Sequence, residues 1–509
     1  MRKKLLWALP VGVLASLAVP QLALADIIDS ESGVLTDGAA INTLWVMVAA
    51  FLVMFMQAGF MLLEIGFSRG KNAGTVVPKI LINFSIAALA WWACGFAFAF
   101  GPGEIIGDTG FFLQNFGDPA TAFPVMGFSD AAVEAKFFFQ FVFCAVSLAI
   151  VWGTTLERIK FGVYVIYAIV FAALIYPIGA HWVFGGGWLQ SNIGMQDFAG
   201  STAVHLIGAT GGLAVLLLLG ARKGKYGGDG KPRPIPGHNM PMFGLGVLIL
   251  WLGWFGFNPG STLGALDGRF AEVALITQLA CAAGVIAAAV VSRLTQKTLD
   301  IGMVGNGAIA ALVAITAPSG YVETWAAPII GAVAGVLVVL AIPAIDKLID
   351  DPVGALSAHG LAGVWGTLSC GIFTAPRLAE YNVFGVTNSD GEFIGGFLYA
   401  SGLIGKGAND IGGSFNLEAF EQLGAQALGV AVAFAFVFAA SFATFYVIKQ
   451  VYGLRVTETE EDAGLDISEH GMYGYPETFI PQGEFPGAAT SPTAAASAAT
   501  AVRPAPSES

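Results

Sequence analysis

Two of the five histidines of this chain, His205 and His359, lie inside long apolar stretches of the sequence. Each follows an aspartate by eight residues, Asp197 or Asp351, and a glycine stands three positions after each aspartate. A neutral imidazole donates a hydrogen bond from one nitrogen and accepts one at the other, so two in contact offer both functions to a small polar molecule. Such a pair can also pass a proton. A single buried histidine is as often a helix–helix hydrogen-bond partner, but the matched surroundings of these two favour a shared site.

The two aspartates are better explained as helix caps than as substrate ligands. Eight helical residues span about 12 Å, which places each carboxylate far from its histidine along the helix axis. A carboxylate at the start of a helix accepts hydrogen bonds from free backbone N–H groups. We therefore expect Asp197 and Asp351 to begin the helices that carry His205 and His359.

Aromatic residues gather in three short segments, 139–143, 181–188 and 254–261. Aromatic faces near an entrance attract a small cation by about 0.5–2 kcal/mol. The alternative is the ordinary aromatic belt at a membrane interface. Composition alone favours the belt, and both interpretations remain open at this point.

The elements that must position these residues are membrane helices. Only 11% of the 509 residues are charged and 56% are hydrophobic, whereas a soluble protein carries about 25% charged residues. This excludes a cytosolic enzyme, a nucleic-acid binder and a disordered protein. The 67 glycines suit closely packed membrane helices. The four cysteines show no CxxC spacing, and no hydrolase triad, zinc spacing or phosphate loop is present. We expect no enzyme activity, no metal and no cofactor.

The N-terminus has the pattern of a secretory signal peptide, residues 1–25. Arg2–Lys4 is a basic segment, Leu5–Val19 is apolar, and Ala23–Ala25 has the small residues of a cleavage site. The alternative is an uncleaved first span. With cleavage, the mature N-terminus begins outside the cytoplasm.

Apolar windows separated by polar breaks predict eleven membrane spans. They lie near residues 41–63, 80–101, 136–156, 161–180, 198–220, 240–258, 270–292, 301–318, 325–345, 357–376 and 420–448. With the N-terminus outside, most Lys and Arg residues fall in the inner connections, as the positive-inside rule requires. The C-terminus is therefore expected inside.

The expected fold is an all-α polytopic membrane protein with an inverted repeat of five plus five spans and an eleventh helix outside it. The histidines stand five spans apart, and an odd-numbered repeat must be inverted in the membrane. No charged residue lies in the middle of a predicted span. We expect a transmembrane domain over 26–448, a cytoplasmic regulatory tail over 449–475 and a disordered extension over 476–509, which is rich in Pro, Ala and Ser.

Several motifs together resemble the ammonium transporter (Amt/Mep/Rh) family. They occur in family order from about residue 41 to 475, and include Arg69-Gly70-Lys71-Asn72, Asp197-Phe198-Ala199-Gly200, Trp254-Phe255-Gly256-Phe257-Asn258, His359-Gly360 and Gly453-Leu454-Arg455-Val456. The resemblance implies an Amt/Rh-type fold and a homotrimer in the bilayer, with a narrow apolar pore in each subunit. The signal peptide resembles bacterial, in particular cyanobacterial, members, which implies the bacterial inner (plasma) membrane.

The resemblance also implies roles for individual residues. His205 and His359 match the twin pore histidines, Phe143 and Phe257 the stacked phenyl gate, and Ser261 the outer ammonium recruitment site. Asp197 and Trp254 are expected to support the site through structure.

The chain departs from the family pattern at one recruitment position. Phe184 stands where bacterial members with a well-defined outer cation site have a tryptophan. Phenylalanine binds a cation more weakly than tryptophan. Either the outer site is weaker, or the neighbouring Trp182 contributes.

The function implied is transport of ammonium and ammonia across the plasma membrane. Ammonium is recruited outside, loses its proton near the gate, and passes the histidines as ammonia. Two alternatives remain: an Rh-type gas channel for ammonia and carbon dioxide, and an ammonium sensor that signals through its tail. A PII-type signal protein is a possible cytoplasmic partner, and no nucleic acid is expected.

Overall fold

The computed structural model describes residues 34–114, 117, 119–127, 129–379, 385–387, 393, 395–404 and 417–480. The expected signal peptide and most of the expected extension lie outside these residues. Within them, the regular secondary structure is helical apart from isolated bridges, such as the one that joins Ile159 to Arg455.

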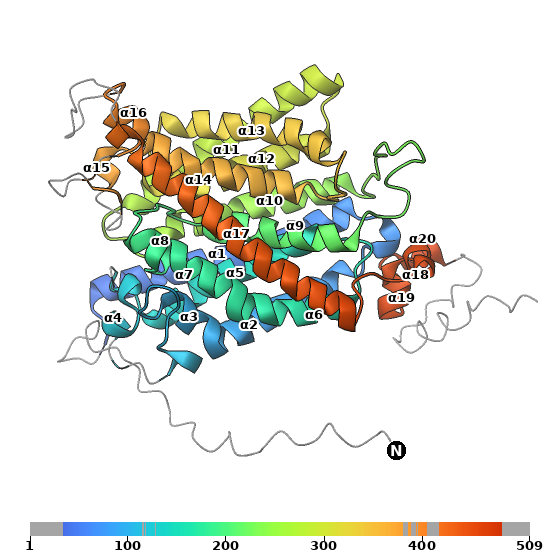
Figure 1. Cartoon of the computed structure of the whole chain (residues 1–509), viewed down its shortest axis with the longest axis horizontal. Coiled ribbons are helices and arrows are strands. Elements are labelled where there is room, and N and C mark those ends of the chain that lie inside the picture. Colours follow the sequence, from blue (N-terminus) through green and yellow to red (C-terminus); the bar gives the residue numbers. More distant parts are fainter. Residues whose placement is uncertain are drawn as a thin grey trace, which may run out of the picture.

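The long helices lie side by side along one axis (Figure 1), with α18–α20 at one end of the bundle and α4, α15 and α16 at the other. Apolar side chains cover most faces of these helices. Some of them pack inside the bundle and others remain on its outer surface, so the bundle is apolar both inside and outside. The main helices are α1 (Asp37–Phe67), α2 (Val76–Ala90), α3 (Phe96–Phe100), α5 (Val133–Gly153), α6 (Phe161–Val170), α7 (Tyr176–Phe184), α9 (Ile207–Leu219), α10 (Met240–Phe257), α11 (Arg269–Gln296), α12 (Ile301–Thr316), α13 (Ala326–Ile345), α14 (Ala362–Phe373) and α17 (Glu421–Val451). The short ones are α4 (Pro119–Ala122), α8 (Trp188–Ser191), α15 (Pro376–Ala379), α16 (Phe397–Ala400), α18 (Glu458–Ala463), α19 (Leu465–His470) and α20 (Pro476–Phe479).

Nine helices of the described part are long and apolar enough to cross a membrane. The shorter α12 is also apolar. The protein is therefore a polytopic helical membrane protein, as the composition predicted.

Four stretches of π-helix interrupt or begin these spans, and the hydrophobic pattern of the sequence does not predict them. They are Trp91–Gly95, Phe171–Ile175, η7 (Ser201–Leu206) and η10 (Leu356–Leu361). π-Turns are rare and occur often at functional sites. Both η7 and η10 contain one of the two candidate histidines.

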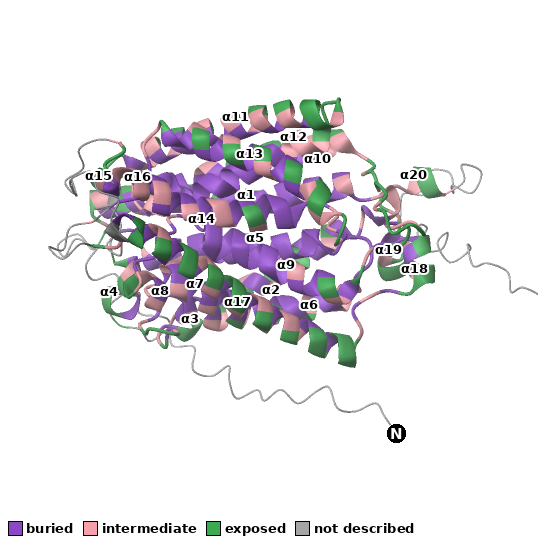
Figure 2. Cartoon of the chain, turned by 45° about the horizontal axis from the view of Figure 1, so that its top comes forward, coloured by how far each residue is buried: buried purple, intermediate pink, exposed green. Residues whose placement is uncertain are grey.

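Burial separates the central helices from the outer ones. Figure 2 shows α5 buried along most of its length, whereas α11 and α17 carry many exposed residues. The exposed side chains of α17 include Leu428, Phe434 and Val447. An exposed apolar face of this kind suits contact with lipid.

Two predicted spans ended just short of charged residues that the helices in fact contain. The helix over 41–63 runs on to Phe67, and the helix expected from residue 80 begins earlier. Glu64 and Lys79 therefore lie inside α1 and α2, where they form a buried ion pair. The sequence pattern did not predict this ion pair, because the pairing depends on how α1 packs against α2.

The first part of the tail docks on the segment between α1 and α2. Lys71 Nζ donates to the carbonyl oxygens of Glu461 and Asp462, at 2.8 and 2.7 Å. The Asp466 carboxylate accepts the backbone N–H groups of Gly74 and Thr75, at 2.9 and 2.8 Å. Burial raises the pKa of Asp466, although these N–H groups oppose that shift. The tail is thus fixed by polar contacts, in addition to the burial of Leu454 and Leu465.

Candidate functional site

The structure brings His205 and His359 into contact. Their Nδ1 atoms are 3.2 Å apart, and the ring centroids are 5.3 Å apart with nearly parallel planes, at 20°. Both side chains are buried. Because one Nδ1 must donate and the other accept, one Nε2 is left as an acceptor and the other as a donor. The Nε2 atom of His205 has no hydrogen-bond partner among the described residues.

Aromatic rings continue this contact away from His359. The rings of Phe143 and Phe257 are stacked, with centroids 4.0 Å apart and planes at 19°. Phe257 stacks on His205 at 5.4 Å. Trp254 stacks on the same imidazole at 5.2 Å. We call the series Phe143, Phe257, His205 and His359 the ring column; all four side chains are buried.

Two local features of η7 position His205 in the ring column. The Asp197 carboxylate accepts four backbone N–H groups, those of residues 200 to 203, at 2.7–3.0 Å. This is the capping position that its spacing from His205 led us to expect. Gly200 has φ +113°, and a Cβ there would stand 2.7 Å from Val204 Cγ2. Trp254 is fixed by a hydrogen bond from Nε1 to Thr316 Oγ1, at 2.9 Å.

The segment before His359 repeats the pattern with fewer contacts. Asp351 Oδ2 accepts the N–H of Leu356 at 2.7 Å. Its Oδ1 atom has no hydrogen-bond partner among the described residues. Gly354 has φ +75°.

Each of the three expected recruitment residues has contact partners of its own. Ser261 follows α10 and donates from Oγ to the carbonyl of Phe257, at 2.9 Å, so it adjoins the ring column. Phe184 stacks on Phe100 at 6.2 Å. Trp182 donates from Nε1 to Ile105 and packs on Phe436 of α17, at 4.6 Å. Trp182 thus contacts α17, and it also meets Trp188 of α8 edge to face at 6.1 Å.

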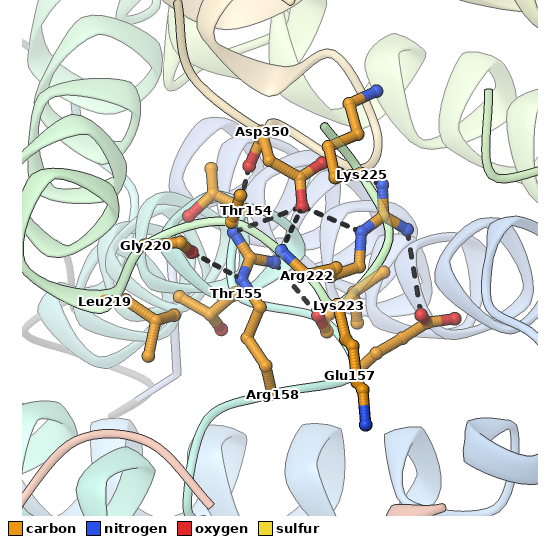
Figure 3. A network of polar contacts seen from close by, with 12 residues as sticks. Thr154, Thr155, Glu157, Arg158, Leu219, Gly220, Arg222, Lys223, Lys225 and Asp350 are labelled. Carbon is orange, nitrogen blue, oxygen red and sulfur yellow. Dashed lines mark hydrogen bonds and ion pairs between the residues drawn. The ribbon is translucent and has the colours of Figure 1, made fainter. Parts of the chain in front are cut away.

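A cluster of buried ion pairs joins the segments that follow α5, α9 and α13 (Figure 3). Arg222 meets the Asp350 carboxylate through its backbone N–H, Nε and Nη2, at 2.8, 3.0 and 2.9 Å. Arg158 donates to the Asp350 carbonyl at 2.9 Å, and Glu157 accepts from Arg69 at 2.6 Å. Burial opposes ionisation of Asp350, but the hydrogen bonds from Arg222 and the charges of both arginines hold its pKa at about 2.

Comparison with known proteins decides the family. A model described as Ammonium Transporter Family matches residues 44–475. The chain belongs to the Ammonium Transporter Family. The sequence is 40% identical over 458 residues to the ammonium transporter Amt2 of Archaeoglobus fulgidus, which covers 88% of this chain and 90% of that protein. It is 36% identical over 449 residues to a putative ammonium transporter of Synechocystis sp., covering 85% and 73% of the two chains.

Solved structures of ammonium transporters and a sensor have the same fold. The structure described as a sensor Amt protein superposes with a TM-score of 0.73 at 34% identity, over 85% of this chain and 99% of that one. Mep2 of Candida albicans gives 0.71 at 25% identity, over 86% and 88%. The prediction of the family from its motifs is confirmed.

Sequence reasoning missed one polar feature beside the ring column. The buried Glu64–Lys79 pair lies close to a cavity of 20 Å³ that His359 and Glu64 both line. The available signal was the position of Glu64, one residue beyond a predicted span. That position alone does not separate an inner loop residue from a buried one.

Proposed function

We propose that the chain conducts ammonia, formed from ammonium, along the ring column from Phe143 to His359. Ammonium transport itself follows from the family. Stripping water from an unpaired cation in an apolar medium costs many kcal/mol. The cation therefore gives up its proton before the stacked rings of Phe143 and Phe257, and ammonia crosses as a neutral molecule.

The observation that carries this proposal is the 3.2 Å contact between His205 and His359 directly beside Phe257. The free donor and acceptor of the imidazole pair suit ammonia, which both donates and accepts hydrogen bonds. Ser261 supports recruitment at the outer end, because its hydroxyl adjoins Phe257. Phe184 and Trp182 contribute aromatic surface farther from the column.

Flux measurements in proteoliposomes test the route. His205→Ala removes half of the imidazole pair, and we expect at least a tenfold loss of ammonium uptake after an ammonium pulse. His238→Ala is the matched control, because His238 contacts the carbonyl of Ser68 outside the column, and its uptake stays within twofold of wild type. Wild-type uptake and selectivity in His205→Ala would defeat the proposal. A current that accompanies the flux means that the proton follows ammonia along the histidines, and flux without current means that it stays outside.

Two other activities are tested on the same proteoliposomes. A gas channel of Rh type would raise carbon dioxide permeability along with ammonia permeability, and we expect no such rise. A sensor role is favoured by one observation, the docking of the tail on the segment between α1 and α2 through Lys71 and Asp466. If the tail signals, a chain cut before Thr457 keeps its flux but loses the ammonium response in cells.

We propose eleven crossings, made by the nine long helices together with α12 and the continuous helix over 356–373. The first five and the next five then form an inverted repeat, which the matched Asp–Gly–His segments support. The mature N-terminus lies outside after removal of residues 1–25, and the tail lies in the cytoplasm of a bacterial cell. Labelling of cysteines introduced at Leu266 (outside) and Tyr473 (inside) with an impermeant reagent tests this orientation.

We propose a homotrimer and a PII-type partner at the cytoplasmic face. Apolar side chains exposed on α1 and α10, among them Phe51, Phe55 and Leu248, provide surface for contact between copies or with lipid. Native mass spectrometry tests the trimer. A pull-down from cytosol with varied nucleotides tests the partner, and consistent absence of any PII protein would exclude it.

A further inference from the structure

A small cavity lies beside His359, at the end of the ring column opposite to Phe143. Its volume is 20 Å³, enough for one molecule the size of water, ammonia or ammonium. Phe60 and Ile150 supply apolar walls, and Asn306 and Glu64 supply polar atoms. A molecule that leaves His359 on this side therefore enters a cavity that a carboxylate lines.

One carboxylate oxygen of Glu64 is paired, and the other lies beside this cavity. The residue is only 1% exposed. Its Oε2 atom pairs with Lys79 Nζ. Its Oε1 atom has no hydrogen-bond partner among the described residues, and it lies 3.7 Å from the point where a Cβ on the cavity-lining Gly153 would stand. Half of this buried carboxylate is thus available to a ligand.

A purely structural ion pair accounts poorly for this arrangement. Lys79 is fully buried, and besides Glu64 it faces the ring of Tyr164 at 5.7 Å. Buried ion pairs are weak stabilisers, because desolvation offsets the attraction between the charges. Inside membrane segments, ionisable side chains mark ion pathways more often than packing sites.

We propose that Glu64 Oε1 forms an inner binding site for the ammonium cation, between His359 and the cytoplasm. This inference rests on the proposed function and adds a second cation site to it. Ammonia that passes His359 becomes ammonium again when it takes up a proton, either the one relayed along the histidines or one from cytoplasmic water. Ammonium has four N–H donors, and a carboxylate oxygen accepts one of them in a charge-assisted hydrogen bond. Asn306, which also lines the cavity, offers an amide oxygen.

Lys79 weakens the binding of ammonium at this site, as transport requires. A conducting site must bind its ion well enough to be occupied and weakly enough to release it. The positive charge of Lys79 cancels much of the field of Glu64 at the cavity. Without Lys79 the site would hold ammonium longer and slow the turnover.

Side-specific kinetics test the inner site. Proteoliposomes of known orientation are supplied with ammonium at either face, and the half-saturation concentration is measured for each. The double variant Glu64→Gln/Lys79→Met keeps the interior free of unpaired charge. We expect its half-saturation concentration at the cytoplasmic face to rise about tenfold, while the outer value stays within twofold of wild type. Lys79→Met alone is expected to lower the cytoplasmic value.

The matched control is Gln57→Leu, since Gln57 is another buried polar residue of α1 and does not line the cavity. It should change neither face selectively. Equal changes at both faces in the double variant, or no change at all, would overturn the inner site. Failure of the proposed function looks different, because wild type itself would then show no flux that depends on His205.

If the double variant does not fold, wild-type crystals soaked with thallium(I) decide the question. Thallium(I) is a monovalent cation close in size to ammonium, and its anomalous signal locates it directly. A peak beside Glu64 Oε1 supports the site. A thallium-soaked crystal without density in this cavity contradicts it.

Discussion

The two histidine segments share a design but are anchored differently. Each has an aspartate, a glycine at positive φ and a π-helical stretch that carries the histidine, η7 for His205 and η10 for His359. The residue just before each aspartate differs. Before Asp197 stands Gln196, and before Asp351 stands Asp350.

Neutral amides hold the first segment. Gln426 of α17 accepts the backbone N–H of Gln196 at 2.7 Å and donates to its carbonyl at 2.6 Å. Charges hold the second segment, where Arg222 and Arg158 converge on Asp350. Hydrogen bonds between neutral groups do not depend on titration, whereas ion pairs do. The comparison teaches that one local design is anchored without charge in the first segment and with charge in the second.

Removing the ionic anchor should have the largest effect. Asp350→Ala leaves Arg158 and Arg222 buried without their carboxylate, which costs about 3–5 kcal/mol of unfolding free energy. Asp462→Ala is the control, because Asp462 is exposed and pairs with the exposed Lys223, and it should cost less than about 1 kcal/mol. Chemical unfolding in detergent measures both. A similar loss in the two variants would contradict the special role of Asp350.

Replacing the capping aspartates should have the next largest effect on unfolding free energy, and the two replacements should differ. Asp197→Asn gives up acceptor positions for several of its four N–H groups, and we expect a loss of about 2–3 kcal/mol. Asp351→Asn should lose about 1 kcal/mol, since one of its oxygens is already unpaired. The same unfolding assay measures the pair. If Asp351→Asn proved the more harmful, the comparison of the two segments would be reversed.

Acid should weaken the second anchor. The pKa of Asp350 is lowered to about 2, below its value in an unfolded chain, so its stabilising contribution is complete above about pH 4 and disappears as the pH falls toward 2. The contribution is on the order of 2 kcal/mol. Unfolding free energy measured from pH 5 to pH 2 should fall less steeply in Asp350→Asn than in wild type. Parallel curves for the two proteins would argue against this assignment.

The smallest difference concerns the two glycines. Gly200→Ala places a side chain at φ +113° and against Val204, and we expect a cost of about 1–2 kcal/mol. Gly354→Ala should cost about 1 kcal/mol, because φ is +75° and the nearest atom is the flexible end of Ile342. Thermal unfolding midpoints in detergent rank the two variants. Ammonium flux should fall only in proportion to the folded fraction.

Much of the site was predictable because it depends on spacing along the chain. The matched Asp–Gly–His segments identified His205 and His359 as candidate site residues. The eight-residue offset predicted that Asp197 caps the helix. Phe143 and Phe257 came from the family resemblance, and the structure stacks them. Trp182 was harder, because a side chain on a membrane helix can face either of two neighbours, and only packing shows that it meets α17.

The sequence by itself determined a membrane bundle, the family and the residues of the ring column, because apolar run lengths and motif spacings are local properties of the chain. Only the tertiary structure decided the π-helical segments, the anchors through Gln426 and Asp350, and the pairing of Glu64 with Lys79 beside a cavity. These features join residues from different helices. Their energy comes from burial and hydrogen bonds that exist only once the helices have packed together.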